Sequence, residues 1–437
     1  MATFYVQSGA GGSATNSGST DQSSANLSGS NATGLGTSTI TLDGSPDLSG
    51  LVTSGATQST IYLNNATNAN QKIFKITAFD NGAKTVTVSG TPTGSDGGTW
   101  AIGGRLVWTP ANIEAALAAG DTVIFNDSPA TRTSTFITLR ASGDSTSGFI
   151  TIRGKTGVRP VLNITSGAAA VITANSQTNI KIQNLELDQD ATGDGISATT
   201  GWVIENVKIS DANIGISANG GIVVIGCEIT GTVSHGISVS AGNLVVVGSY
   251  IHDCSGSGVV HSGTAPTGSI VNNIIDTNSA RGVYLSGAAS AQTHGVLIMG
   301  NTIYGNGDSG IQVDNANIVA TVLNNILSEN GNAAGEYNIE WATSADLHGY
   351  HGYNVLFHSG GGGAANLSNY TANSTELTTD PGFTNPASGD FTIGASSPAA
   401  NAGFPGAYLG GGTAYRDIGA MQRQVSAGGG VVGVIGG

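Results

Sequence analysis

Branched apolar residues recur through the middle of the chain in two columns, with about twenty residues or slightly more between successive members. In each column the apolar residue follows a turn-forming glycine or asparagine. The first column comprises Gly195-Ile196, Gly215-Ile216, Gly236-Ile237, Gly258-Val259, Gly282-Val283, Gly310-Ile311 and Asn338-Ile339. The second comprises Asn184-x-x-Leu187, Asn206-x-x-Ile209, Gly226-x-x-Ile229, Gly248-x-x-Ile251, Asn272-x-x-Ile275, Gly300-x-x-Ile303 and Asn324-x-x-Leu327.

Two columns that advance together predict a coil with corners. Glycine and asparagine tolerate the left-handed backbone that a corner needs, and the branched residues stack inward from one turn of the coil to the next. At about 4.8 Å for each strand spacing, the steps from Leu187 to Leu327 rise on the order of 29 Å. Because no helical period separates the apolar segments, we expect an all-β fold, a right-handed parallel β-helix.

The sequence on either side of the repeat predicts further regions. Residues 73–79 and 85–88 flank Asp80-Asn81-Gly82 and predict a β-hairpin, inside a Gly/Ser/Thr-rich β unit over residues 1–104 that attaches to a particle or caps the coil. The solenoid is expected over residues 105–359, and a loop-rich C-terminal cap with a Gly-rich tail over residues 360–437. Thr109-Pro110 followed by residues 112–119 predicts a short capping helix that ends at Gly120.

Composition narrows the function classes. The chain has 437 residues with 68 glycines, and only 10% of its residues are charged. The formal net charge of −14 argues against nucleic acid and anionic membranes as partners, because both need a basic surface. It also disfavours a strongly acidic polysaccharide, unless a local basic patch or a metal ion offsets the repulsion. We expect Cys227 and Cys254 to be small buried residues. No signal peptide and no membrane-spanning run is visible.

The chain resembles right-handed β-helix repeat proteins, the superfamily of pectate lyases, the chondroitinase and alginate lyase group and phage tailspikes. The resemblance rests on Phe4-Tyr5-Val6 as a first strand, residues 113–117 and 120–123 as a cap and first turn, and closing motifs near the end. These are Asp380-Pro381-Gly382-Phe383, Gly389-Asp390-Phe391, Ser397-Pro398-Ala399 and Asp417-Ile418-Gly419-Ala420. It covers roughly residues 105–424 and implies the fold, whereas a fold shared by unrelated functions implies little about activity.

Basic residues are scarce where a lyase mechanism would need them. The β-helix lyases that the chain resembles rely on lysine or arginine, often with calcium, and between Ile209 and Tyr415 the only such residue is Arg281. Five further basic residues lie in the predicted early turns, either as a patch or as ordinary solvated surface: Arg132, Arg140, Arg153, Lys155 and Arg159.

A glycoside hydrolase needs two carboxylates roughly 5–5.5 Å apart for retention or 6.5–9.5 Å for inversion. Asp211 and Asp253 occupy equivalent positions two turns apart, which is about 9.6 Å by strand spacing. Asp276 and Glu329 continue the acidic line, so these four residues are the catalytic candidates. The alternative is that an aspartate at a coil corner only stabilises its own turn.

Metal and glycan sites have their own candidates. His348 with His351 and the run His252-Asp253-Cys254 lack a complete ligand set, so no metal site and no cofactor is expected, except that Asp188, Asp190 and Asp194 could hold calcium. Aromatic side chains near the long loops could stack on sugar rings: Tyr284, Tyr304, Tyr337, Trp341, Tyr350 and Tyr353.

These observations leave three functional hypotheses. The first is a phage virion protein, a tailspike, fibre or capsid decoration, that forms a homotrimer and contacts other virion proteins and cell-surface polysaccharide. The second is an extracellular carbohydrate-active enzyme, with a glycoside hydrolase favoured over a polysaccharide lyase by the scarcity of basic residues. The third is a bacterial surface adhesin. The expected location is the virion or the extracellular space.

Overall fold

The structure is a computed structural model that describes most of the chain. The described residues are 2–7, 19–20, 26–55, 57–67, 71–104, 114–167, 169–264, 266–287, 294–315, 317–331, 333, 335–341, 350–360, 367–369, 371–404 and 417–422. It divides into two compact units, residues 1–208 and residues 209–437. The Gly-rich tail predicted at the end of the chain lies outside the described residues.

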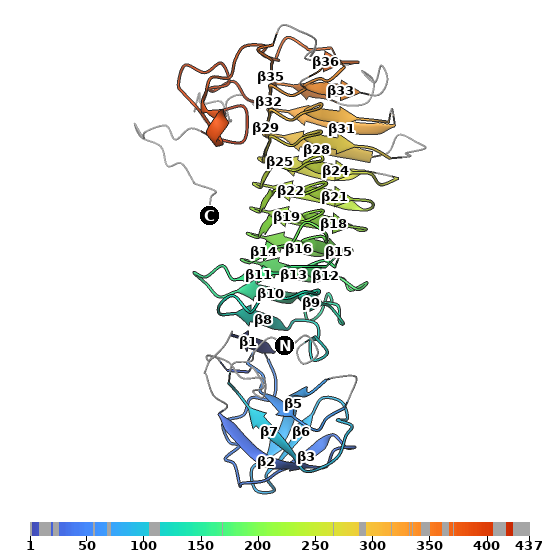
Figure 1. Ribbon diagram of the computed structural model, residues 1–437, viewed down its shortest axis with the longest axis vertical. Coiled ribbons are helices and arrows are strands. Elements are labelled where there is room, and N and C mark those ends of the chain that lie inside the picture. Colours follow the sequence, from blue (N-terminus) through green and yellow to red (C-terminus); the bar gives the residue numbers. More distant parts are fainter. Residues whose placement is uncertain are drawn as a thin grey trace. The chain divides into compact units, whose positions relative to one another are not determined.

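The first unit begins with one strand of the β-helix and then forms a closed antiparallel barrel (Figure 1). The predicted hairpin is confirmed, since residues 73–80 pair antiparallel with residues 85–88. Trp100, Phe74 and Ile61 fill the barrel core, and the indole of Trp100 donates to Asp43 Oδ1 at 2.7 Å. The barrel strands are β2 (Leu27–Thr33), β3 (Thr39–Leu42), β4 (Thr60–Leu63), β5 (Ile73–Asp80), β6 (Thr85–Val88) and β7 (Gly98–Ile102).

The remainder of the first unit forms the early turns of a right-handed parallel β-helix, which confirms the predicted fold class. Its first sheet contains β1 (Thr3–Val6), β8 (Thr122–Phe125), β10 (Ile150–Gly154), β13 (Ile180–Gln183) and β16 (Trp202–Glu205). The second contains β11 (Val161–Asn163) and β14 (Glu186–Asp188), and the third contains β9 (Ile137–Thr138), β12 (Ile172–Thr173) and β15 (Ile196–Ala198). β17 (Lys208–Ser210) spans the boundary of the two units.

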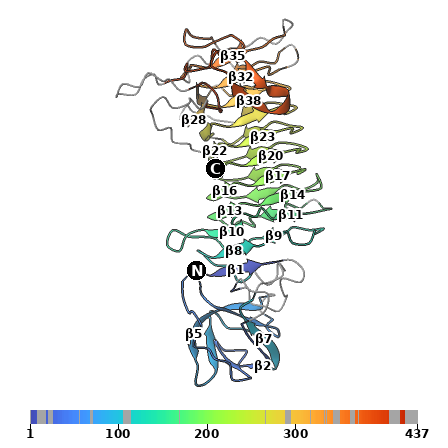
Figure 2. The same cartoon turned by 90° about the vertical axis from the view of Figure 1, so that its left-hand side faces the viewer.

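The second unit repeats the same three strands in each turn of coil, as Figures 1 and 2 show. Its first sheet contains β19 (Ile222–Ile225), β22 (Asn243–Val247), β25 (Thr267–Val271), β28 (His294–Met299), β31 (Ile318–Leu323) and β34 (His351–Gly352). The second contains β20 (Glu228–Thr230), β23 (Tyr250–His252), β26 (Ile274–Asp276), β29 (Thr302–Tyr304), β32 (Ile326–Ser328) and β35 (Val355–Phe357). The third contains β18 (Ile216–Ala218), β21 (Ile237–Val239), β24 (Val259–His261), β27 (Val283–Leu285), β30 (Ile311–Val313), β33 (Ile339–Trp341) and β36 (Leu367–Ser368).

The corners of the second column have the left-handed backbone that the sequence predicted, whereas the glycines of the first column do not. Asn184, Asn206, Gly226, Asn272 and Asn324 all have φ between 52° and 58°. A second corner with positive φ follows the strands of the second sheet from β17 to β32, at Asp211, Gly231, Asp253, Thr277, Gly305 and Glu329. In these turns two sharp corners let three short strands close around an apolar interior.

The glycines of the first column are needed for a different reason, close contact with the next turn of coil. A Cβ on Gly236 would lie 2.6 Å from the carbonyl oxygen of Gly258, and one on Gly282 would lie 2.6 Å from that of Gly310. Real Cβ atoms do not approach an oxygen so closely, so glycine is required at these two positions. The isoleucine or valine that follows each glycine points inward and is fully buried.

The predicted capping helix is wrong where the structure describes it. Residues 114–116 form a turn, and residues 105–113 lie outside the described residues. The buried Glu114 carboxylate accepts from the Thr138 amide at 2.6 Å, and Asp121 accepts from the amides of Ala118 and Ala2. Because side-chain carboxylates, rather than helical carbonyls, accept hydrogen bonds from backbone amides here, the segment forms a turn instead of a helix. Within the described residues no helix has the length and hydropathy that a membrane span requires.

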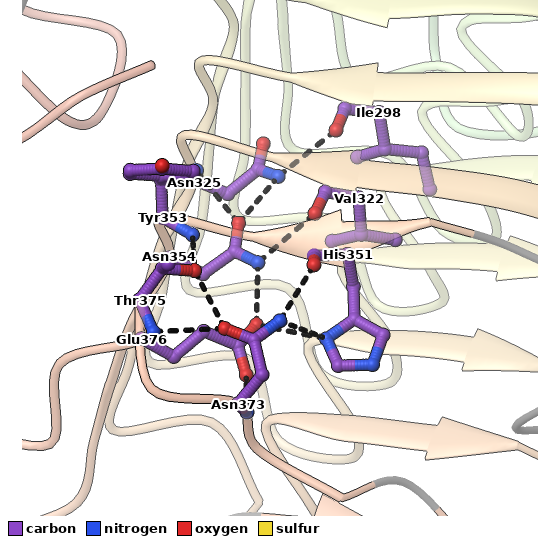
Figure 3. Close-up of polar contacts among 9 residues, drawn as sticks. All are labelled: Ile298, Val322, Asn325, His351, Tyr353, Asn354, Asn373, Thr375 and Glu376. Carbon is purple, nitrogen blue, oxygen red and sulfur yellow. Dashed lines mark hydrogen bonds and ion pairs between the residues drawn. The ribbon is translucent and has the colours of Figure 1, made fainter. Parts of the chain in front are cut away.

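Two rows of buried asparagines run inside the second unit, and all their members except Asn338 directly follow a corner residue. The first row comprises Asn273, Asn301, Asn325 and Asn354, and the second comprises Asn278, Asn306, Asn330 and Asn338. In the first row each Nδ2 donates to the Oδ1 of the next asparagine and to a strand carbonyl. Figure 3 shows the end of this row, where Asn354 donates to Glu376 Oε1 at 2.8 Å and to the carbonyl of Val322 at 3.0 Å.

After the coil, residues 377–404 and 417–420 lie along the outer face of the second sheet. Ile326 and Val355 point outward from their strands, yet they are fully buried against Ile393, Ala399 and Ile418. This returning segment contains β37 (Phe383–Asn385), the short 3₁₀ helix Pro386–Ser388 and β38 (Asp390–Ile393), drawn in orange in Figures 1 and 2. The returning segment therefore covers the outer face of the second sheet around β32 and β35.

Candidate functional site

The third sheet of the second unit presents an outer face whose row of side chains is half-buried, except for Val260, which is buried. Its strands pair in register through their middle residues, so these residues form one row from turn to turn. Their neighbours on each strand, such as Val283 and Leu285, are buried inside, and the middle residues therefore point outward. In chain order the row is Ser217, Ser238, Val260, Tyr284, Gln312, Glu340 and Ser368.

Arg281 organises the middle of this face. Its guanidinium lies 4.6 Å from the centre of the Tyr284 ring, donates through Nη2 to Asp308 at 3.0 Å and donates through Nε to Gln312. The Tyr284 hydroxyl donates to Asp314 Oδ2 at 2.8 Å. We call these five residues the Arg281 cluster. Each of its polar groups is held by another, so the cluster is already arranged for a ligand.

Burial and neighbouring charges shift the pKa values of Tyr284 and of the nearby His235. Burial, followed by the interaction with Asp314, raises the pKa of Tyr284, so the phenol stays protonated. Burial and the nearby charge of Arg281 lower the pKa of His235, whose Nδ1 accepts from the Ser257 amide at 3.0 Å. The face therefore combines one aromatic ring, a neutral imidazole and one fixed cation with several carboxylates. Such planar polar groups around a ring can bind the hydroxyls and the apolar face of a sugar.

The other proposed aromatic residues lie in different environments. Trp341 packs inside the coil, 4% exposed, and Tyr304 packs against Phe383 and Phe391 of the returning segment. Tyr353 occupies a corner and packs against Phe404. Tyr350 is exposed, and Tyr337 is half-buried beside Ser309. Among the six, Tyr284 and Tyr337 border the outer face of the third sheet.

The four proposed catalytic carboxylates are not gathered in one place. Asp211, Asp253 and Glu329 occupy equivalent corner positions with φ between 54° and 56°, and Glu329 accepts from the amide and hydroxyl of Ser359. Asp276 differs, because it ends a strand and is only 3% exposed. The structure connects two of the four, since the Thr277 hydroxyl lies 3.1 Å from Asp253 Oδ1 and 3.4 Å from Asp276 Oδ2.

Asp276 is an incompletely satisfied buried acid. Its Oδ1 is buried without a hydrogen-bond partner, and burial, followed by the repulsion from Asp253, raises its pKa from 3.8 to about 6 despite the opposing influence of His252. The His252 ring stacks on Tyr250 at 4.0 Å and contacts Asp253 at 2.7 Å. We call Tyr250, His252, Asp253, Asp276 and Thr277 the Asp276 cluster. The sequence suggested its aspartates but not Tyr250 or Thr277, which carry no motif.

The returning segment closes over the Asp276 cluster. A Cβ on Gly389 would lie 2.9 Å from the Tyr250 hydroxyl oxygen, so the segment between β37 and β38 touches this tyrosine. A sugar could therefore reach the Asp276 carboxyl only if this segment moved away. The exposed carboxylate of Asp253 needs no such movement.

Two of the three proposed calcium ligands accept hydrogen bonds from neighbouring side chains. Asp190 Oδ1 accepts from the Thr192 hydroxyl at 2.6 Å, which lowers the pKa of Asp190, and Asp188 accepts from Asn163. Within the described residues no group of three histidine, cysteine or acidic side chains is arranged to hold a metal ion. Cys227 and Cys254 are buried, as predicted, and no disulfide joins these two described residues.

The comparison with protein families agrees with the fold. Residues 161–295 match the family of right-handed beta helix regions. No curated protein matches the sequence. Three similar solved structures are a pectate lyase, the A-module of a mannuronan C-5 epimerase of Azotobacter vinelandii and a rhamnogalacturonan lyase. Their TM-scores are 0.43, 0.38 and 0.36, and their sequence identities are 13%, 12% and 11%. They cover 74%, 60% and 63% of this chain, and 92%, 90% and 82% of their own chains.

Proposed function

We propose that the protein binds a glycan along the outer face of the third sheet in its second unit. The observation that carries this proposal is the Arg281 cluster, in which a tyrosine ring is surrounded by arginine, glutamine and aspartate side chains held in fixed positions. Two small side chains, Ser217 and Ser238, precede Val260 and the cluster in the same row. An extended ligand made of repeating units fits a surface that itself repeats at each strand.

The protein's biological setting is also part of the proposal. A phage virion protein, such as a tailspike, fibre or capsid decoration, would use this face to contact host surface glycan. We expect a homotrimer, with three chain masses of 43.4 kDa each in light scattering, and we expect the protein in purified particles. A stable monomer that is absent from particles would exclude this setting and leave the glycan face to be tested by itself.

Replacing Tyr284 by alanine should weaken glycan binding by about tenfold, because a stacking ring in a preformed site contributes on the order of 1–2 kcal/mol. Binding would be measured on a glycan array and then by calorimetry with the best ligand. Tyr284→Phe keeps the ring and loses only the bond to Asp314, so it should retain most of the affinity. Tyr5→Ala, a half-buried tyrosine of the first unit, is the matched control. Equal binding by Tyr284→Ala and the unaltered protein would contradict the proposed site.

A glycoside hydrolase is the second candidate, favoured by the contact of Asp253 and Asp276 with one hydroxyl and by the raised pKa of Asp276. A carboxyl that keeps its proton near pH 6 suits a general acid, and an ionised neighbour suits a base or nucleophile. Release of reducing ends from a polysaccharide panel, lost in both Asp253→Asn and Asp276→Asn, would support this activity. Unchanged release in both variants would exclude this pair.

A further inference from the structure

A hollow of about 320 Å³ opens on the first unit at the corner between β10 and β11. It is lined by Arg153, Gly154, Thr156, Gly157, Gln183 and Asn184. Its size is at the lower end of the range of about 300–1,000 Å³ for small-molecule sites, which suits one or two sugar units. The pocket belongs to the first unit, whereas the Arg281 cluster belongs to the second.

The wall of this pocket is held in place by an asparagine at the next corner. Asn184 Nδ2 donates to the carbonyls of Lys155 and Val158, at 3.2 and 2.6 Å, and Asn184 Oδ1 accepts from Asn206 at 3.1 Å. Gly154 is required at the base of this loop, since a Cβ there would lie 2.3 Å from the carbonyl oxygen of Asn184. The loop over residues 155–158 is therefore fixed before any ligand arrives, which reduces the entropic cost of binding.

Arg153 places positive charge at the pocket, and part of the hydrogen-bonding capacity of its guanidinium is unused. Arg153 and Gln183 are paired positions on neighbouring strands. The Arg153 guanidinium donates only to the carbonyl of Gly154, at 3.3 Å, and no ion pair joins it to a carboxylate of the described residues. The nearest acidic position in the same row, Glu205, already contacts Lys181 at 2.9 Å and Gln183 at 2.8 Å.

Two further basic residues, Lys155 and Arg159, lie on the same loop and are exposed. In a chain with a net charge of −14, this local excess of positive charge is unusual. A guanidinium with unused donors presents the planar fork that binds a carboxylate or sulfate through two parallel hydrogen bonds. The amide of Gln183 and the hydroxyl of Thr156 supply neutral groups for sugar hydroxyls in the same hollow.

We propose that this pocket binds the acidic group of a sugar, a carboxylate or a sulfate, with Arg153 as its main partner. The site extends the proposed glycan-binding function to an acidic saccharide, and it explains how a negatively charged protein could accept one. It is independent of the Arg281 cluster, because its residues come from other strands.

The test is calorimetric titration of the full chain with short uronate oligosaccharides, sulfated oligosaccharides, neutral oligosaccharides of equal length and inorganic sulfate. We expect at least one acidic series to bind, with an affinity that falls as salt rises, and the neutral series to bind at least tenfold more weakly. Arg153→Gln should reduce the affinity for the acidic series by about tenfold. Arg153→Lys, which keeps the charge without the fork, should fall between the two.

Lys72→Gln removes the same charge from the barrel and is the matched control, expected to bind as the unaltered protein does. Thermal unfolding of each variant separates lost binding from lost folding. Equal binding of neutral and acidic sugars, or unchanged binding in Arg153→Gln, would overturn the proposal. Inorganic sulfate that binds as tightly as the sugars would show an anion site without saccharide selectivity and would overturn the saccharide part. Binding that is lost in Tyr284→Ala but kept in Arg153→Gln would support the third-sheet face alone.

Discussion

Replacing Asn301 by alanine is expected to lower the free energy of unfolding by about 3–5 kcal/mol, the range of a buried polar network that loses one member. Asn301 is fully buried in the middle of the first asparagine row. Its Oδ1 accepts from the amide and the side chain of Asn273, at 2.9 and 3.0 Å. Its Nδ2 donates to the carbonyl of Ile270 at 2.8 Å and to Asn325 Oδ1 at 2.9 Å.

The large effect follows from what alanine leaves behind. The methyl group replaces none of these four hydrogen bonds, so two donors of Asn273 and two acceptors each lose one bond inside the buried row. The Asn273 amide loses its partner outright, whereas Asn273 Nδ2 keeps the carbonyl of Val246 and Asn325 Oδ1 keeps the Asn301 amide. Each unsatisfied buried group costs about 1–3 kcal/mol, and bonds in one buried row strengthen one another. Chemical denaturation followed by far-UV circular dichroism would measure the loss.

An exposed asparagine of the same unit provides the comparison. Asn385 bonds only to Ser388 at the protein surface, and Asn385→Ala should change stability by less than about 0.5 kcal/mol. A loss below about 1 kcal/mol in Asn301→Ala would mean that water or a rearranged neighbour replaces its bonds. The asparagine row would then contribute little to the free energy of unfolding.

The corners of the coil were predictable from sequence, whereas the asparagine rows were not. A corner with positive φ restricts the residue type, so glycine and asparagine mark the corners from Asn184 to Asn324, although Tyr353 takes the same position one turn later. The next position only has to fit the interior, and along the chain it is Leu185, Val207, Cys227, Ser249 and then four asparagines. An asparagine beside a corner is normally exposed. Its burial depends on an equivalent asparagine about one turn away, which is a tertiary condition.

The environments of the aromatic and acidic candidates could not be predicted from the sequence for a related reason. Tyr304 and Asp276 point outward from the second sheet, as the alternation of each strand requires, and they would be exposed if the coil stood alone. The returning segment buries them through contacts such as Tyr304 with Phe391, about ninety residues apart in sequence. The closing motifs around Asp390 were visible in the sequence, but nothing in their residues indicates which face they cover.

The second large effect concerns Asp276 and depends on pH. Because the folded protein raises the pKa of this carboxyl from 3.8 to about 6, the folded state binds its proton more tightly than the unfolded state does. Below about pH 4 both states are protonated and the group costs nothing. Between about pH 4 and 6 the unfolded state ionises first, so stability falls, and above pH 6 the full cost of about 2–3 kcal/mol is present.

Asp276→Asn removes this cost because an amide does not ionise. The difference in unfolding free energy between the variant and the unaltered protein should therefore move in favour of the variant by about 2–3 kcal/mol between pH 4 and pH 7.5. Measuring the change across pH, rather than one value, cancels any constant effect of the amide on packing. Denaturant midpoints at several pH values give this difference directly.

The same series distinguishes burial from repulsion as the cause of the raised pKa. Asp253→Asn leaves Asp276 buried but removes the neighbouring negative charge, so the pH at which stability falls should move down while part of the loss remains. If the loss disappeared entirely in Asp253→Asn, repulsion rather than burial would control the carboxyl. If it were absent from the unaltered protein, Asp276 would be ionised in contact with water. The returning segment would then leave this face open, and the second sheet would become available to a ligand.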